Sequence, residues 1–142
     1  MTQKDKELLL KDLCARLPYG VMISVKDYNE PCKVEAIYDN LDVKIKGCLC
    51  YNLVFECRYY LRPMSSMTEE EFVYFMGLRG RMLQSYKIQS MMKEAFNASQ
   101  CMLIVTKLGN YSDKIDWLNA HHFDYHGLIE KGLALEAPEG MY

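Results

Sequence analysis

Five short segments with the two-residue period of β-strands follow one another between Val21 and Leu61, and they constrain the fold more than any other feature. Turn residues separate them, among them Asn29-Glu30-Pro31 and Asp39-Asn40. A flat sheet of such short strands cannot bury both of its faces, whereas a curled sheet can. The sequence therefore predicts a small curled antiparallel β-barrel, SH3-like in form, from residues 21–26, 33–38, 41–46, 49–56 and 58–61.

An amphipathic helix is predicted before the first strand, where it would cap one open end or one face of the barrel. Pro18-Tyr19-Gly20 stops this helix, because proline disfavours helical geometry at Leu17 and glycine permits the turn. The apolar side of the helix consists of Leu9, Leu10, Leu13, Cys14 and Leu17. The other side is predicted to carry Lys6, Lys11, Asp12 and Arg16.

A helix start follows the β region and Pro63. Thr68 and Glu71 have the spacing of a capping box, in which each residue bonds a backbone amide near the other. Gly77 and Gly80 weaken the middle of the predicted helix and permit either close packing or a kink. The expected apolar stripe is Phe72, Phe75, Met76, Leu78 and Met82.

Three more elements are predicted toward the C-terminus. A helix over residues 86–96 would turn Ile88, Met91, Met92 and Ala95 inward, and the apolar run 101–106 reads as a short buried strand. Ser112 or Asp113 would cap a last helix with Ile115, Leu118 and His122 on one face. The predicted fold class is α+β, with a capping helix and barrel over residues 1–62 and helices over residues 63–142, packed as one domain.

Composition fits a folded soluble protein, since half of the 142 residues are apolar and a quarter are charged. The net charge of −2 argues against a dedicated nucleic-acid coat. The charged start Met1-Thr-Gln-Lys-Asp-Lys-Glu is unlike a signal peptide, and no apolar run approaches the ~20 residues that a membrane helix needs. We therefore expect a cytoplasmic protein with reduced cysteines and no cofactor.

All three histidines and the single tryptophan lie within residues 117–126. His122, Asp124 and His126 alternate as metal ligands on a strand would, and together with His121 they suggest a metal-dependent or acid–base site. The structural alternative, which we favour, is a helix end. His121 and His122 would then interact with the last helical carbonyls, and Asp124 would accept hydrogen bonds from backbone amides in the turn near Gly127.

Other chemical signatures are weak. Cys48, Cys50, Cys57 and Cys32 include a single close pair, so they are expected in the core rather than on zinc. No G-x-S-x-G motif and no glycine-rich phosphate loop is present. Basic residues gather near Tyr86, namely Arg79, Arg81, Lys87 and Lys93, and the predicted barrel adds Lys26, Lys33, Lys44 and Lys46. They form either a solvated charged face or a nucleic-acid contact surface.

Three stretches resemble small uncharacterised proteins of Bacteroides and their prophages. They are Leu8-Leu-Leu-Lys-Asp-Leu-Cys-Ala-Arg-Leu-Pro-Tyr-Gly-Val21, Tyr60-Leu-Arg-Pro-Met-Ser-Ser-Met-Thr-Glu-Glu-Glu71 and the ending His122-Phe-Asp-Tyr-His-Gly-Leu-Ile-Glu-Lys-Gly-Leu-Ala-Leu-Glu136. The resemblance assigns no catalytic or binding residue. It implies a bacterial cytoplasm or a mobile genetic element as the setting.

The sequence predicts a non-enzymatic protein that binds another macromolecule. In a prophage setting this would be a modulator of a host or defence protein. The expected contact residues lie outside the resembling stretches and are Arg79, Arg81, Met82, Tyr86 and Lys87. The alternatives are a nucleic-acid-binding protein that uses the same basic helices and the barrel, and a metal-dependent enzyme centred on His121, His122, Asp124 and His126.

Overall fold

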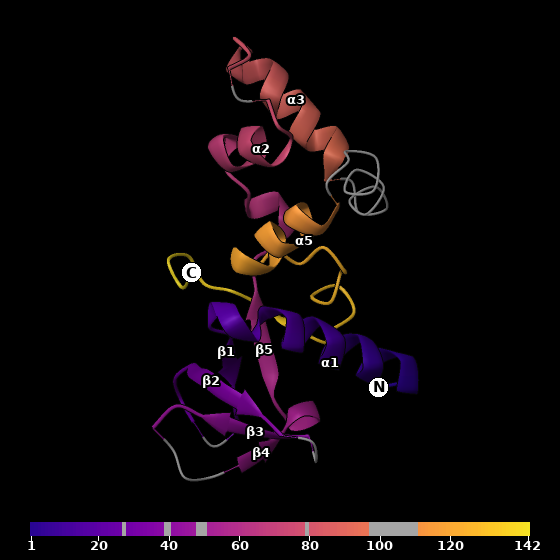
Figure 1. Ribbon diagram of the computed structural model, residues 1–142, viewed down its shortest axis with the longest axis vertical. Coiled ribbons are helices and arrows are strands. Elements are labelled where there is room, and N and C mark those ends of the chain that lie inside the picture. Colours follow the sequence, from indigo (N-terminus) through magenta and orange to yellow (C-terminus); the bar gives the residue numbers. More distant parts are fainter. Residues whose placement is uncertain (27, 39–40, 48–50, 79, 97–110) are drawn as a thin grey trace.

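A computed structural model describes residues 1–26, 28–38, 41–47, 51–78, 80–96 and 111–142. The fold is α+β, as predicted. The molecule is elongated, with the sheet at one end and the helices α2 and α3 at the other (Figure 1). Helix α1 crosses between the sheet and α5, and it contacts α5 (Figure 1).

The sheet has the order β4-β3-β2-β1-β5-β6. All neighbouring strands are antiparallel except β5 and β6, which are parallel. The strands from β1 to β4 form a meander, and β5 returns to pair with β1. Their bounds are β1 Met22–Ser24, β2 Cys32–Ile37, β3 Asp42–Ile45, β4 Tyr51–Leu53, β5 Arg58–Leu61 and β6 Leu135–Glu136.

The predicted closed SH3-like barrel is wrong, because the sheet stays open. Closure requires the outer strands to pair, yet β4 pairs with β3 alone among the strands that the structure describes. The free side of β5 is instead occupied by β6 and by a bridge between Arg62 and Phe123. The predicted strand over 49–56 is also shorter than expected, since a 3-10 helix begins at Val54.

Helix α1 spans Gln3–Arg16, and Thr2 caps it in a box with Asp5. A 3-10 turn over Leu17–Tyr19 follows and ends at Gly20, so the predicted stop is confirmed. The predicted sides of the helix are partly wrong, because Cys14 is exposed whereas Asp12 and Arg16 are buried. The buried residues Leu9, Asp12, Leu13 and Arg16 lie at i, i+3, i+4 and i+7 and therefore form one stripe.

Helix α2 spans Glu69–Phe75, and the predicted capping box of Thr68 and Glu71 is present. The helix ends much earlier than the apolar stripe suggested. Gly77 adopts a left-handed φ of +67°, which ends the helix instead of kinking it. Leu78 still packs into the core, but Met82 lies in the connection to α3 and is fully exposed.

Helix α3 spans Ser85–Ala95 and buries Ile88 and Ala95, as the spacing predicted, with Met91 and Met92 half-buried against the same core. Helix α5 spans Tyr111–Ala120. The predicted strand 101–106 lies outside the described residues. No helix in the described part of the chain combines the length and the apolar character needed to cross a membrane.

Two hydrophobic clusters form the described core. One joins the sheet to Leu9 and Leu13 of α1, and the other joins α2, α3 and α5. The C-terminal segment connects them. Its Phe123 and Tyr125 belong to the helical cluster, whereas Leu128 and Ala134 belong to the sheet cluster. One continuous segment therefore ties both ends of the molecule together.

The end of α2 can be tested with Gly77→Ala. A residue with a Cβ pays about 1–2 kcal/mol to hold a left-handed conformation, so we expect the free energy of unfolding to fall by about that amount. Had α2 continued through residue 77, alanine would raise stability by roughly 1 kcal/mol. Urea denaturation shows whether the free energy of unfolding falls or rises in the variant. Ser90→Ala, at an exposed position inside α3, is the control and should leave stability unchanged or slightly raised.

Candidate functional site

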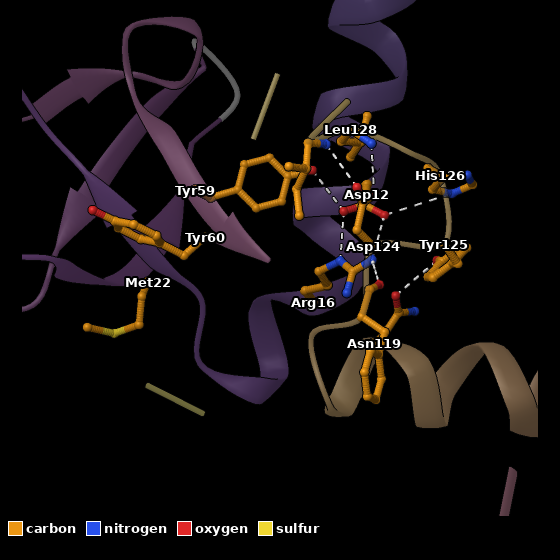
Figure 2. Close-up of polar contacts among 12 residues, drawn as sticks. Asp12, Arg16, Met22, Tyr59, Tyr60, Asn119, Asp124, Tyr125, His126 and Leu128 are labelled. Atoms are coloured by element: carbon orange, nitrogen blue, oxygen red, sulfur yellow. Dashed lines mark hydrogen bonds and ion pairs between the residues drawn. The ribbon is translucent and has the colours of Figure 1, made fainter. Parts of the chain in front are cut away.

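A buried polar cluster lies where α1, β5 and the C-terminal segment meet. Figure 2 shows Asp12 at its centre, with Arg16, Tyr59 and His126 pointing toward it. The Nε of Arg16 donates to Asp12 Oδ2 over 2.7 Å, and Nη2 donates to Oδ1 over 3.0 Å. Both side chains are completely inaccessible to solvent. This is an ion pair with two hydrogen bonds, buried inside the protein.

Two further hydrogen bonds anchor the pair to other elements. The Tyr59 hydroxyl donates to Asp12 Oδ2 over 2.8 Å, and Arg16 Nη2 also donates to the Phe123 carbonyl over 2.8 Å. The Arg16 guanidinium lies 5.1 Å from the centre of the Tyr125 ring, whose hydroxyl donates to Asn119. These contacts offset part of the cost of removing both charges from water. They hold α1 against β5 and against the chain after α5.

The protonation of this cluster is fixed by its surroundings. Burial and the neighbouring Asp12 carboxylate raise the pKa of Tyr59 strongly, so its hydroxyl stays protonated and donates. Burial opposes the charge on Arg16, but the hydrogen bond and charge of Asp12 outweigh it and raise the pKa of Arg16. Every contact described for Asp12 is thus to a donor from the protein itself. Such an arrangement joins elements and offers no open position to a substrate.

The four residues of the predicted metal or acid–base site face different partners. His126 Nε2 lies 3.8 Å from Asp12 Oδ1, whereas His122 Nε2 contacts the Tyr19 carbonyl and its ring stacks on Tyr142. Within the described residues, no three His, Cys, Asp or Glu side chains are placed to hold a metal ion. The structure therefore does not bring His122, Asp124 and His126 together around one point.

The helix-end interpretation agrees with the contacts of this segment. His121 Nδ1 donates to the Trp117 carbonyl over 2.8 Å, one turn back in α5, and its ring stacks on Trp117. Asp124 accepts hydrogen bonds from the amides of Leu128 and Ile129, each over 2.8 Å. His122 has a φ of +58°, so it forms the turn that ends the helical segment.

His122 is the most strongly perturbed histidine of this segment. Since the Tyr19 carbonyl accepts from Nε2, a second proton would have to enter at Nδ1, which is buried and has no hydrogen-bond partner among the described residues. Burial accordingly lowers the pKa of His122 to about 4. Tyr142 covers the ring at 3.8 Å, donates its hydroxyl to the Tyr60 carbonyl and accepts from the Met22 amide. The hydroxyl thereby bridges β5 and β1.

Arg62, which the sequence analysis did not select, makes a second ion pair. It binds Glu71 through two bonds of 2.9 and 3.0 Å, and its guanidinium lies 4.2 Å from the centre of the Phe123 ring. Burial opposes ionisation of Glu71, but Arg62 and the Thr68 amide outweigh it and lower the pKa of Glu71. The same glutamate thus caps α2 and fixes it to the end of β5.

The described members of the predicted contact surface lie in α3 and in the connection before it, at the end of the molecule away from the sheet (Figure 1). Arg81, Met82, Tyr86 and Lys87 are all exposed, while Arg79 lies outside the described residues. Among the cysteines, Cys57 is buried, Cys32 is half-buried and Cys14 is exposed. Cys48 and Cys50 lie outside the described residues, so the proposed core position is observed for Cys57 alone.

The sequence analysis missed Asp12, Arg16 and Tyr59. One signal was available, because Asp12 and Arg16 share a helical stripe with Leu9 and Leu13, and a charged pair within an apolar stripe indicates burial. Tyr59 gave no signal, since it alternates with neighbours as any strand residue does. Its partner on α1 lies 47 positions away in the chain.

The hydrogen bond from Tyr59 to Asp12 can be tested with Tyr59→Phe. A bond to a charged group contributes about 1.5–3 kcal/mol, so we expect urea denaturation to show a loss of that size. Tyr60→Phe is the matched control on the same strand, since Tyr60 is half-buried and its hydroxyl has no hydrogen-bond partner in the described part of the chain. A loss of equal size in both variants would contradict the assignment.

His122 makes stability depend on pH. Its pKa is about 4 in the folded protein and about 6.5 when unfolded, so the unfolded chain binds more protons between these values. Stability is therefore present above pH 6.5 and is lost as the pH falls toward 4, by about 2 kcal/mol between pH 7 and pH 5. Asparagine tolerates a positive φ, so His122→Asn should keep the backbone conformation. It should also remove the part of the fall in unfolding free energy that comes from protonation of His122. Urea denaturation of both proteins at pH 7 and pH 5 measures this difference. A variant with the same pH dependence as the original protein would contradict the assignment to His122.

Comparison of the chain with protein-family models, with curated proteins and with solved structures gives no match. The roles assigned to the residues above rest on their contacts within this chain.

Proposed function

We propose that this protein acts by binding another protein through an exposed surface formed by Arg81, Met82, Tyr86 and Lys87, which we call the α3 surface. The observation that supports this most is Met82. Its side chain is 104 % exposed, while the described methionines other than Met1 are buried or half-buried. When a partner covers an apolar side chain that is fully hydrated in the free protein, the burial of that side chain makes the free energy of binding more favourable.

The neighbours of Met82 have the composition of an interaction surface. Tyr86 is 63 % exposed, and Arg81 and Lys87 are exposed beside it in the chain. Methionine, tyrosine and arginine are the residue types enriched where proteins meet, because they combine large contact areas with adaptable shape or directional hydrogen bonds.

The backbone that presents the α3 surface is held in place. In the connection before α3, the Arg81 amide donates to the Leu78 carbonyl, and the Leu83 amide donates to the Arg81 carbonyl. Glu69 of α2 accepts hydrogen bonds from Ser85 and Gln89 at the start of α3. A surface with fixed backbone loses less conformational entropy on binding than a free loop does.

The charges of the α3 surface indicate the chemical character of the partner's binding surface. Two cationic side chains around Met82 favour an apolar pocket with carboxylates at its rim. The resemblance to prophage proteins supports a host or defence protein of the bacterial cytoplasm as this partner. We regard the protein as a binding modulator and not as an enzyme, because the polar cluster at Asp12 is closed to solvent.

Affinity capture from a bacterial host lysate tests the proposal, with mass spectrometry and nucleic-acid staining as readouts. We expect a specific protein to be captured with and without nuclease, and Met82→Ser to reduce its capture by about tenfold or more, the loss typical of a central contact. Stability should change by less than about 0.5 kcal/mol, since Met82 buries nothing.

A charge reversal provides the second arm. The double variant Arg81→Glu and Lys87→Glu should abolish capture. The control double variant Lys4→Glu and Lys11→Glu changes the net charge by the same amount at exposed positions of α1, and it should leave capture unchanged. Capture that is unchanged in both α3-surface variants would overturn the proposal. Capture that disappears with nuclease and falls steeply with salt would replace it with nucleic-acid binding.

A further inference from the structure

A groove lies on the sheet, far from the α3 surface. It has a volume of about 640 Å³, and its lining includes Met22, Tyr28, Glu30, Pro31, Lys33 and Lys46. Its lining residues come from β1, from β2 and the connection before it, and from the end of β3. These strands lie in the lower part of Figure 1. Sites for small ligands commonly have volumes of roughly 300–1,000 Å³. The groove is therefore large enough for a ligand or for a few residues of a peptide.

The strand register brings two lysines together in this groove. Lys33 pairs with Met22 of β1 on one side, and its carbonyl accepts from the Lys46 amide over 2.9 Å on the other. The neighbouring pair Val34 and Ile45 is buried, so Lys33 and Lys46 project from the opposite face of the sheet. Like charges at directly opposed positions destabilise an antiparallel pair. An anion beside both lysines removes that cost.

A third lysine on the same two strands shows the contrast. Lys44 has a counter-ion, since its Nζ lies 2.9 Å from Glu35 Oε2. Neither Lys33 nor Lys46 has a carboxylate within 4.0 Å among the described residues, although Glu30 also lines the groove. Of the described lysines on and directly after these two strands, the two without a carboxylate partner thus both line the groove.

The end of the Lys33 side chain contacts Gly20. A Cβ at this position would lie 3.0 Å from both Cε and Nζ of Lys33, so the end of the lysine lies directly over the glycine. Gly20 also has a φ of +88°, which favours glycine independently. The end of the Lys33 side chain therefore packs against the residue that follows the 3-10 turn Leu17–Tyr19, and a larger residue there would obstruct it.

We propose that this groove binds an oxyanion, a phosphate or a carboxylate, carried by a ligand with an apolar part. Lys33 and Lys46 supply the positive charge and the N–H donors, and Tyr28 and Pro31 supply apolar contact area. A nucleic-acid backbone fits less well, because it requires a row of cations whereas the groove has two lysines and the acidic Glu30. The proposal is independent of the α3 surface.

The test is a titration of isotope-labelled protein followed by two-dimensional NMR, with inorganic phosphate and acetate as separate probes against sodium chloride of equal ionic strength. We expect saturable shifts of the Lys33, Lys46 and Gly47 amide signals with at least one oxyanion and none with chloride. The stronger probe identifies the source of the oxyanion as phosphate or carboxylate. Lys33→Gln and Lys46→Gln should each weaken binding about threefold to tenfold, and the double variant should abolish it.

Lys11→Gln on α1 is the matched control, since it removes one exposed lysine outside the groove, and it should bind as the original protein does. Dispersed NMR spectra establish that each variant is folded. Lys46→Gln should be as stable as the original protein or more so, because it removes the cross-strand repulsion. Absence of saturable shifts with both oxyanions, or equal shifts in the double variant, would overturn the proposal.

Discussion

The buried ion pair of Asp12 and Arg16 is the interaction on which the arrangement of the elements depends. It joins α1 to Tyr59 of β5 and to the Phe123 carbonyl, so one pair of side chains positions three separate segments. Removing two charges from water costs several kcal/mol for each ion, and the geometry offsets this cost when the partners are complete. If one partner is lost, the other is left as an unpaired buried charge. The cluster therefore specifies which surfaces of the elements meet.

The C-terminal segment covers the side of β5 that another strand would occupy in a closed barrel. Strand β6 and Phe123 pair along the free side of β5 and its continuation, and the Tyr142 hydroxyl bridges the Tyr60 carbonyl and the Met22 amide. A sheet whose side is already occupied need not close on itself to satisfy its backbone groups. The segment that contains the histidine cluster is thus a structural connection between the sheet and the helices, and His122 is buried within it.

The exposed features lie at the two ends of the molecule. The α3 surface presents Met82 and Tyr86 beside two cationic side chains, and the sheet groove presents Lys33 beside Lys46. The interior cluster between them is closed to solvent. Binding at either end would act on a frame whose central ion pair is buried and is hydrogen-bonded to Tyr59 of β5 and to the Phe123 carbonyl.

The sequence by itself determined the local elements, because capping boxes, helix stops and alternating patterns act through neighbours in the chain. Examples are the capping box at Thr68, the helix stop at Gly20 and the end of the helix after Trp117. Only the tertiary structure decided that Asp12 and Arg16 are buried, that α2 ends at Gly77 and that the sheet stays open. The burial of the ion pair and the open sheet depend on contacts between segments far apart in the chain, such as Tyr59 with Asp12 and β6 with β5, and the local pattern of one segment does not specify its distant partner. The end of α2 depends on the backbone conformation of Gly77, and glycine is compatible with several conformations, so the sequence does not select one.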